Sequence, residues 1–96
     1  MKKGYWVVSY RTITDPQAAK NYSALAANAI EAAGGRIFSR GIAVEAHEAG
    51  RVERTVLVEF DDVEKAKAAY ESDAYKKALA VLTGAAERDF RIVEGV

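Results

Sequence analysis

The chain has 96 residues, half of them hydrophobic, with 14 basic and 14 acidic side chains and no cysteine. A chain of this length can bury one core, so we expect a single domain over residues 1–96 and, because a small domain hides a modest share of its surface, an oligomer. The balanced charge argues against a nucleic-acid partner, and the lack of cysteine excludes disulfides and thiolate metal sites. No apolar run is long enough for a signal peptide or a membrane span, so we expect a cytoplasmic protein without a membrane partner.

The first third of the chain predicts a strand followed by a helix. Residues Gly4–Arg11 are rich in aromatic and β-branched side chains, which favour strands. Asp15 before Pro16 indicates a helix start, because the carboxylate accepts from free backbone N–H groups and proline tolerates the first helical position. An apolar stripe then recurs at helical spacing until Gly34 and Gly35, so we expect a helix over about Asp15–Ala33. The residues of this stripe are Ala18, Tyr22, Leu25, Ala29 and Ala33.

The middle of the chain predicts two further strands. The first covers Arg36–Glu48 and contains Gly41, which suggests a bulge or bend. A turn around Gly50 leads into Val52–Phe60, the strongest strand pattern in the sequence. We therefore expect these two strands to form a hairpin.

The last third predicts two short helices and a strand. The acidic start at Asp61–Glu64 resembles a capping box and opens a helix that continues to about Glu71. Ser72 is a new N-cap, and the helix after it closes at Gly84. The final strand is expected over Asp89–Glu94. The order β-α-β-β-α-β, with right-handed crossovers, predicts an α+β fold of the ferredoxin-like type: a four-stranded antiparallel sheet with helices on one face.

The strand patterns also predict what each sheet face meets. Alternate residues point to opposite sides of a sheet, so the following residues are expected to face the helices: Trp6, Val8, Tyr10, Val56, Val58 and Phe60. The opposite face then carries an apolar patch: Tyr5, Val7, Leu57 and Val93. A contiguous exposed patch of this kind usually marks an interface, which predicts a homodimer formed through the sheet faces.

Four segments carry a family resemblance. They are "KGYWVVSYRTITDPQAAKNY", "GGRIFSRG", "RTVLVEFDDVEKAKAAYESDAYKKAL" and "AAERDFRIVEG". Together they resemble the small bacterial family called domain of unknown function 1330, within the dimeric α+β barrel superfamily. The resemblance implies a ferredoxin-like protomer and a dimer through sheet faces, and it implies no activity. Other branches of the superfamily include cofactor-independent monooxygenases, haem-degrading enzymes and muconolactone isomerase-like proteins, so the fold alone does not choose a function.

A few polar side chains are candidates for a ligand site. The guanidinium of Arg40 can hold a carboxylate or phosphate through two contacts, or it can form a structural ion pair with Glu59. Strand alternation places three further candidates on the face expected to meet the partner: Ser9, Glu59 and Arg91. The aromatic side chains are assigned to packing: Trp6, Tyr22, Tyr70 and Tyr75.

Two other groups of polar residues are interpreted as non-functional. His47 lies near the hairpin end between acidic neighbours, which is typical of a solvated side chain rather than a general base. Glu87, Arg88 and Asp89 follow the helix stop and are interpreted as an exposed turn.

The leading functional hypothesis is a homodimer that binds a small organic molecule, with an anion as one option for its class. One alternative is a cofactor-independent oxygenase or isomerase, and another is a structural or regulatory dimer without a ligand. The sequence has no metal, nucleotide or nucleophile motif, so no cofactor and no metal are expected.

Overall fold

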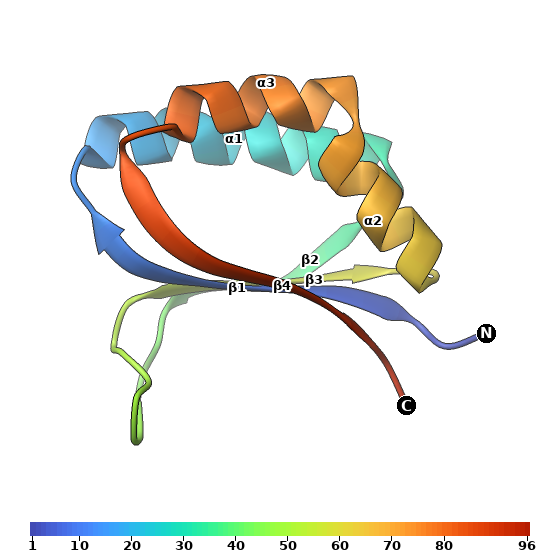
Figure 1. The fold of residues 1–96 in the computed structure, drawn as a ribbon, viewed down its shortest axis with the longest axis horizontal. Helices are drawn as coiled ribbons and strands as arrows, with labels where there is room; N and C mark the ends of the chain where they lie inside the picture. The colour runs from blue at the N-terminus through green and yellow to red at the C-terminus, as the bar shows by residue number, and fades with distance from the viewer.

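Four strands form one antiparallel sheet in the order β2-β3-β1-β4, and three helices cover one of its faces (Figure 1). A computed structural model describes all residues, Met1–Val96. The elements follow one another as β1 (Gly4–Ile13), α1 (Pro16–Ala32), β2 (Arg36–Ile42), β3 (Arg54–Phe60), α2 (Val63–Glu71), α3 (Asp73–Leu82) and β4 (Ala86–Glu94). The expected α+β, ferredoxin-like arrangement is confirmed, with the second helical segment divided at Ser72 as predicted.

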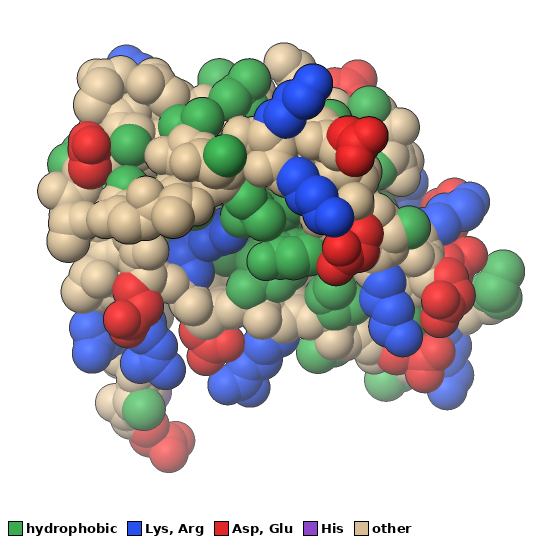
Figure 2. All heavy atoms as spheres, turned by 45° about the horizontal axis from the view of Figure 1, so that its top comes forward, with side chains coloured by type: hydrophobic (Ala, Val, Ile, Leu, Met, Phe, Trp, Pro, Cys, Tyr) green, Lys and Arg blue, Asp and Glu red, His purple; other side chains and the backbone are tan.

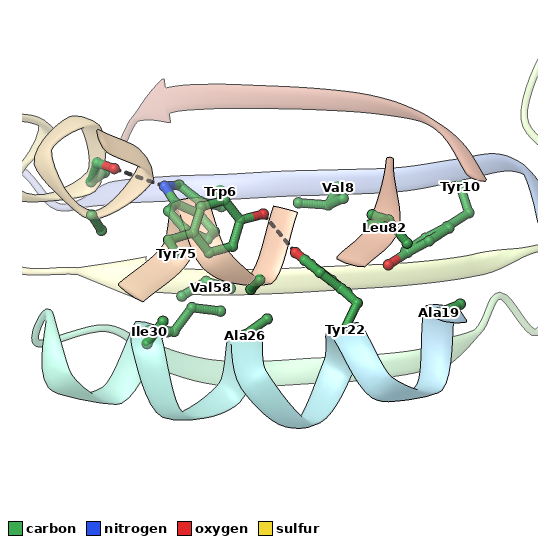
Figure 3. Close-up of a cluster of buried hydrophobic side chains, with 14 of the residues drawn as sticks. Trp6, Val8, Tyr10, Ala19, Tyr22, Ala26, Ile30, Val58, Tyr75 and Leu82 are labelled. Atoms are coloured by element: carbon green, nitrogen blue, oxygen red, sulfur yellow. Dashed lines mark hydrogen bonds between the residues drawn. The ribbon is translucent and has the colours of Figure 1, made fainter. Parts of the chain in front are cut away.

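The core lies between the helices and the sheet and is centred on Trp6 of β1. Trp6 is 1% exposed, and its indole N–H donates to the carbonyl oxygen of Ala66 at 2.9 Å (Figure 3). Its ring packs against Phe60 and Tyr75, with ring centroids 5.1 and 4.9 Å apart. The strand residues predicted to face the helices do so, and five of them are buried: Trp6, Val8, Tyr10, Val58 and Phe60.

Helix α1 packs on the sheet through mostly small side chains. It begins after Asp15, whose carboxylate accepts from a backbone N–H of the first turn at 3.1 Å. Its buried residues are Ala19, Tyr22, Ala26, Ala29 and Ile30. Leu25, which the sequence pattern assigns to the apolar stripe, is instead 45% exposed, because the buried face is rotated from the predicted one. Gly34 ends the helix region with a φ of 84°, and a Cβ on Gly35 would lie 2.6 Å from the Phe60 ring.

The connection between β2 and β3 differs from the prediction. Strand β2 ends at Ile42 and does not extend to Glu48, whose positive φ of 54° is incompatible with a strand. Residues 43–53 instead project as a loop from the sheet face opposite the helices (Figure 1). The register irregularity in β2 follows Ile37 rather than occurring at Gly41.

None of the three helices combines the length and the apolar character that a membrane crossing requires.

Candidate functional site

A narrow cleft lies between α1 and the helix-facing side of the sheet. Its free volume, open mouth included, is about 390 Å³, but the space that the centre of a water molecule can occupy is about 30 Å³. Of the 15 residues that line it, 11 are hydrophobic, and the remaining four are Ser23, Arg40, Arg54 and Arg88. No aspartate or glutamate lines the cleft. The cleft is therefore a thin apolar slot with basic groups, which suits a flat or linear organic group better than a bulky one.

The strand registers bring the three arginines to the same end of the sheet. Tyr10 of β1 pairs with Arg88 of β4. On the other side of β1, the register that pairs Ser9 with Thr55 places Arg54 of β3 opposite Tyr10. Neighbouring strands lie about 4.8 Å apart, so the backbones of these two arginines are about 10 Å apart. Arg40 of β2 pairs with Val56, which lies two residues along β3 from Arg54. Three long side chains from three strands can thus converge on one ligand group.

Aromatic residues hold Arg88 in place. Its guanidinium lies 5.0–5.6 Å from the ring centroids of Tyr22, Phe90 and Tyr10. It donates hydrogen bonds to the hydroxyls of Tyr22 at 3.0 Å and Tyr75 at 3.4 Å. Cation–π contacts and hydrogen bonds to neutral groups orient this cation without neutralising it.

The two tyrosine hydroxyls beside Arg88 are neutral. The oxygens of Tyr22 and Tyr75 lie 2.5 Å apart (Figure 3). Burial, reinforced by Tyr75, raises the pKa of Tyr22 in spite of the nearby Arg88 charge. Burial likewise raises the pKa of Tyr75. The formal charges in the cleft are therefore those of the arginines alone.

No cleft arginine has an acidic partner. The arginine ion pairs of the protein involve Arg11, Arg36 and Arg91, all outside the cleft. Arg54 donates to the hydroxyl of Ser23 at 3.4 Å, a weak contact. Figure 2 shows basic and acidic side chains interspersed over the face that it presents. The cleft thus has an excess of positive charge that is not typical of the surface as a whole.

Of the four predicted ligand-binding residues, Arg40 alone lines the cleft. The other three point to the sheet face opposite the helices, which we call the open face: Ser9, Glu59 and Arg91. There Arg36, rather than Arg40, is the ion-pair partner of Glu59, at 2.8 Å. Arg91 donates to the carboxylate of Asp89 at 2.9 Å, and Asp89 and Ser9 both line a mostly polar pocket on the open face, with a free volume of about 700 Å³. The sheet therefore separates Arg40 from the other three candidates.

The interpretation of Glu87, Arg88 and Asp89 as an exposed turn is wrong. Strand β4 begins at Ala86, so all three residues belong to it. Alternation back from Phe90 places Arg88 on the helix side, where the aromatic rings cover it. Starting the strand at Asp89 left Arg88 outside the pattern that would have identified it.

His47 lies on the exposed loop, and its ring is hydrogen-bonded to the carboxylate of Glu45. Because both side chains are solvated, replacing His47 by alanine is expected to change the free energy of unfolding by less than about 0.5 kcal/mol. Chemical denaturation checks this expectation. A loss of more than about 1 kcal/mol would show that the loop is anchored through this histidine.

The sheet order, the helical layer on one face and the cleft between them define a ferredoxin-like α+β protein. The family described as "Domain of unknown function (DUF1330)" matches residues 3–96, and the chain belongs to this family. The predicted family is thereby confirmed. A comparison with curated proteins finds no significant match.

Solved structures share the fold at low sequence identity. A protein of unknown function from Rhodopseudomonas palustris, RPA0582, is 11% identical, with a TM-score of 0.76 over 99% of this chain and 83% of that one. A dimeric ferredoxin-like protein of unknown function from Thermobifida fusca is 14% identical, with a TM-score of 0.66 over 97% of this chain and 91% of that one. SnoaB, a cofactor-independent oxygenase from Streptomyces nogalater, is 10% identical, with a TM-score of 0.64 over 97% and 92%. At these identities the likeness establishes the fold alone.

Proposed function

We propose that the protein binds a small organic anion, a carboxylate with a thin apolar body, in the cleft between α1 and the sheet. The carrying observation is that Arg40, Arg54 and Arg88 line an apolar slot that contains no acidic side chain. Arg54 and Arg88 are part-buried and Arg40 is exposed, so the cost of an unpaired charge in apolar surroundings falls on Arg54 and Arg88, and an anionic ligand would supply their missing partner. The planar guanidinium fork also matches a carboxylate in two contacts.

Binding is better supported than catalysis. A general acid or base works best with a pKa near the operating pH, whereas burial moves the pKa of Tyr22 and Tyr75 upward, away from neutrality. The cleft contains no histidine or carboxylate that could replace them. The likeness to a cofactor-independent oxygenase reaches the fold and leaves the reaction unsupported.

The ligand proposal is tested with benzoate and hexanoate by calorimetric titration. Replacing Arg40 by glutamine is expected to weaken binding about tenfold or more, because a hydrogen bond to a charged group is lost. Arg40→Lys should recover part of the affinity, since lysine keeps the charge and loses the fork. Arg51→Gln is the matched control, because Arg51 lies on the projecting loop outside the cleft. Absence of carboxylate binding by the wild type, or equal affinities in wild type and Arg40→Gln, would contradict the proposal.

We also propose that two copies associate through the open sheet faces. Phe38 and Val93 are 57% and 42% exposed there, and Phe38 packs edge-on against Tyr5 with ring centroids 6.1 Å apart. Relatives of the same fold are described as dimeric. The loop 43–53 projects on this side of the sheet and would flank a partner (Figure 1). The charged and polar candidates Ser9, Glu59 and Arg91 would then contribute to the border of the interface. Sedimentation equilibrium at micromolar concentration should give the mass of a dimer.

A further inference from the structure

The hydroxyls of Tyr22 and Tyr75 have two protons, and the protein can accept only one of them. The two oxygens are 2.5 Å apart, so one hydroxyl donates to the other. The only other partner of each oxygen is the guanidinium of Arg88, at 3.0 and 3.4 Å. Because a guanidinium has no acceptor, it cannot take the second proton. One tyrosine hydroxyl proton therefore has no acceptor in the protein.

Burial decides which tyrosine retains the free proton. Tyr75 is 0% exposed and lies outside the cleft, so an unused O–H there would be enclosed among apolar side chains. Tyr22 is 6% exposed and lines the cleft. The favourable arrangement is that Tyr75 donates to Tyr22, which leaves the proton of Tyr22 available to the cleft.

With this direction of the hydrogen bond, the Tyr22 hydroxyl can only donate to a ligand. Its oxygen accepts one hydrogen bond from Tyr75 and one from Arg88, and these two bonds occupy both of its lone pairs. The arginines are likewise donors only, so the hydroxyls of Ser23 and Tyr10 are the only side-chain groups of the slot that can still accept. Donors outnumber acceptors in the cleft, so it favours a ligand group that accepts several hydrogen bonds.

We infer that Tyr22 donates its free hydroxyl proton to the ligand, and that the cleft selects ionised acids over amines and alcohols. The inference rests on the proposed function and specifies its ligand class. A carboxylate has two acceptor oxygens and no donor, and it carries the negative charge that would pair with the arginines. A phosphate shares this chemistry, whereas an ammonium group would bring a positive charge and further N–H donors to a site with three arginines.

The inference is tested by measuring benzoate, phenyl phosphate and benzylamine affinities for wild type and Tyr22→Phe. The phenylalanine ring preserves the packing and removes the donor, so benzoate binding should weaken about tenfold or more. Tyr70→Phe is the matched control, because Tyr70 is part-buried, lies outside the cleft and makes no side-chain hydrogen bond; its affinity should stay within about twofold of wild type. Tyr75→Phe should stay within about threefold, because Tyr22 keeps its proton. Benzylamine should not bind.

The outcomes separate the inference from the proposed function. If wild type binds neither benzoate nor phenyl phosphate, both are overturned. If wild type and Tyr22→Phe bind benzoate equally, the donor role of Tyr22 is overturned while anion binding stands. Preference for phenyl phosphate that depends on Tyr22 would support the donor role and overturn the carboxylate as ligand. Should Tyr22→Phe fail to fold, wild type labelled with ¹³C at the tyrosine Cζ atoms provides the test. Benzoate should then shift the Tyr22 resonance and leave that of Tyr70, and an unshifted Tyr22 resonance would overturn the inference.

Discussion

Replacing Trp6 by alanine is expected to lower the free energy of unfolding by about 3–5 kcal/mol. The indole is enclosed by Phe60, Tyr75 and Phe90, with ring centroids 4.9–5.1 Å away, so its removal leaves a cavity that rigid aromatic neighbours cannot fill. The carbonyl oxygen of Ala66 also loses its side-chain donor. The total stability of a small domain is about 5–15 kcal/mol, so this one change removes a large part of it.

Urea denaturation followed by circular dichroism measures the effect. Trp6→Phe is the graded control: it keeps an aromatic ring in the core, loses the indole N–H, and should cost less than the alanine variant. Trp6 is the only tryptophan, so its fluorescence reports this site in the wild type and should show the blue-shifted emission of a buried indole. A loss below about 1 kcal/mol for Trp6→Ala would mean that the core is not organised around this residue.

Most of the fold follows from signals that are local in the sequence. The caps at Asp15 and Ser72 and the glycine at position 84 depend on a few neighbouring residues, and the structure has each of them where the pattern predicts it. The alternation in β1 likewise predicts which face of the strand, the one with Trp6, is buried. The end of β2 was harder to predict. The sequence of residues 43–48 does not exclude a strand, whereas in the structure these residues belong to the loop that leaves the sheet.

The candidate site was predictable only in part, because it depends on registers between strands distant in the sequence. Arg40 was selected for its chemistry and does line the cleft. Arg54 and Arg88 were missed, although alternation from Val56 and Phe90 points each of them toward the helices. The hydrogen bond between Tyr22 and Tyr75 joins two helices and spans 53 residues, and no local pattern predicts it. Helical periodicity can assign both tyrosines to packing, but it cannot show that their hydroxyls meet beside a cation.

The largest expected effect on assembly comes from replacing Leu57 by arginine. Leu57 is at the centre of the open face, paired with Val7 on β1 and with Ser39 on β2. In the proposed dimer this position is covered by the partner sheet, and Glu59 on the same face is already paired with Arg36, so the new guanidinium would lose its water without gaining a free acidic partner. An unpaired buried charge costs about 3–5 kcal/mol, which corresponds to a dimer dissociation constant raised about 100-fold or more.

Ala80→Arg is the matched control, because Ala80 is exposed on α3 in the helical layer, away from the open face. It adds the same charge and should leave the dimer unchanged. Sedimentation velocity at matched concentrations compares the three proteins, and circular dichroism checks that Leu57→Arg remains folded. If the sheet face is the interface, Leu57→Arg weakens the dimer and Ala80→Arg does not, since only Leu57→Arg places the charge beneath the partner. A dimer that resists Leu57→Arg and dissociates in Ala80→Arg would move the interface to the helical layer.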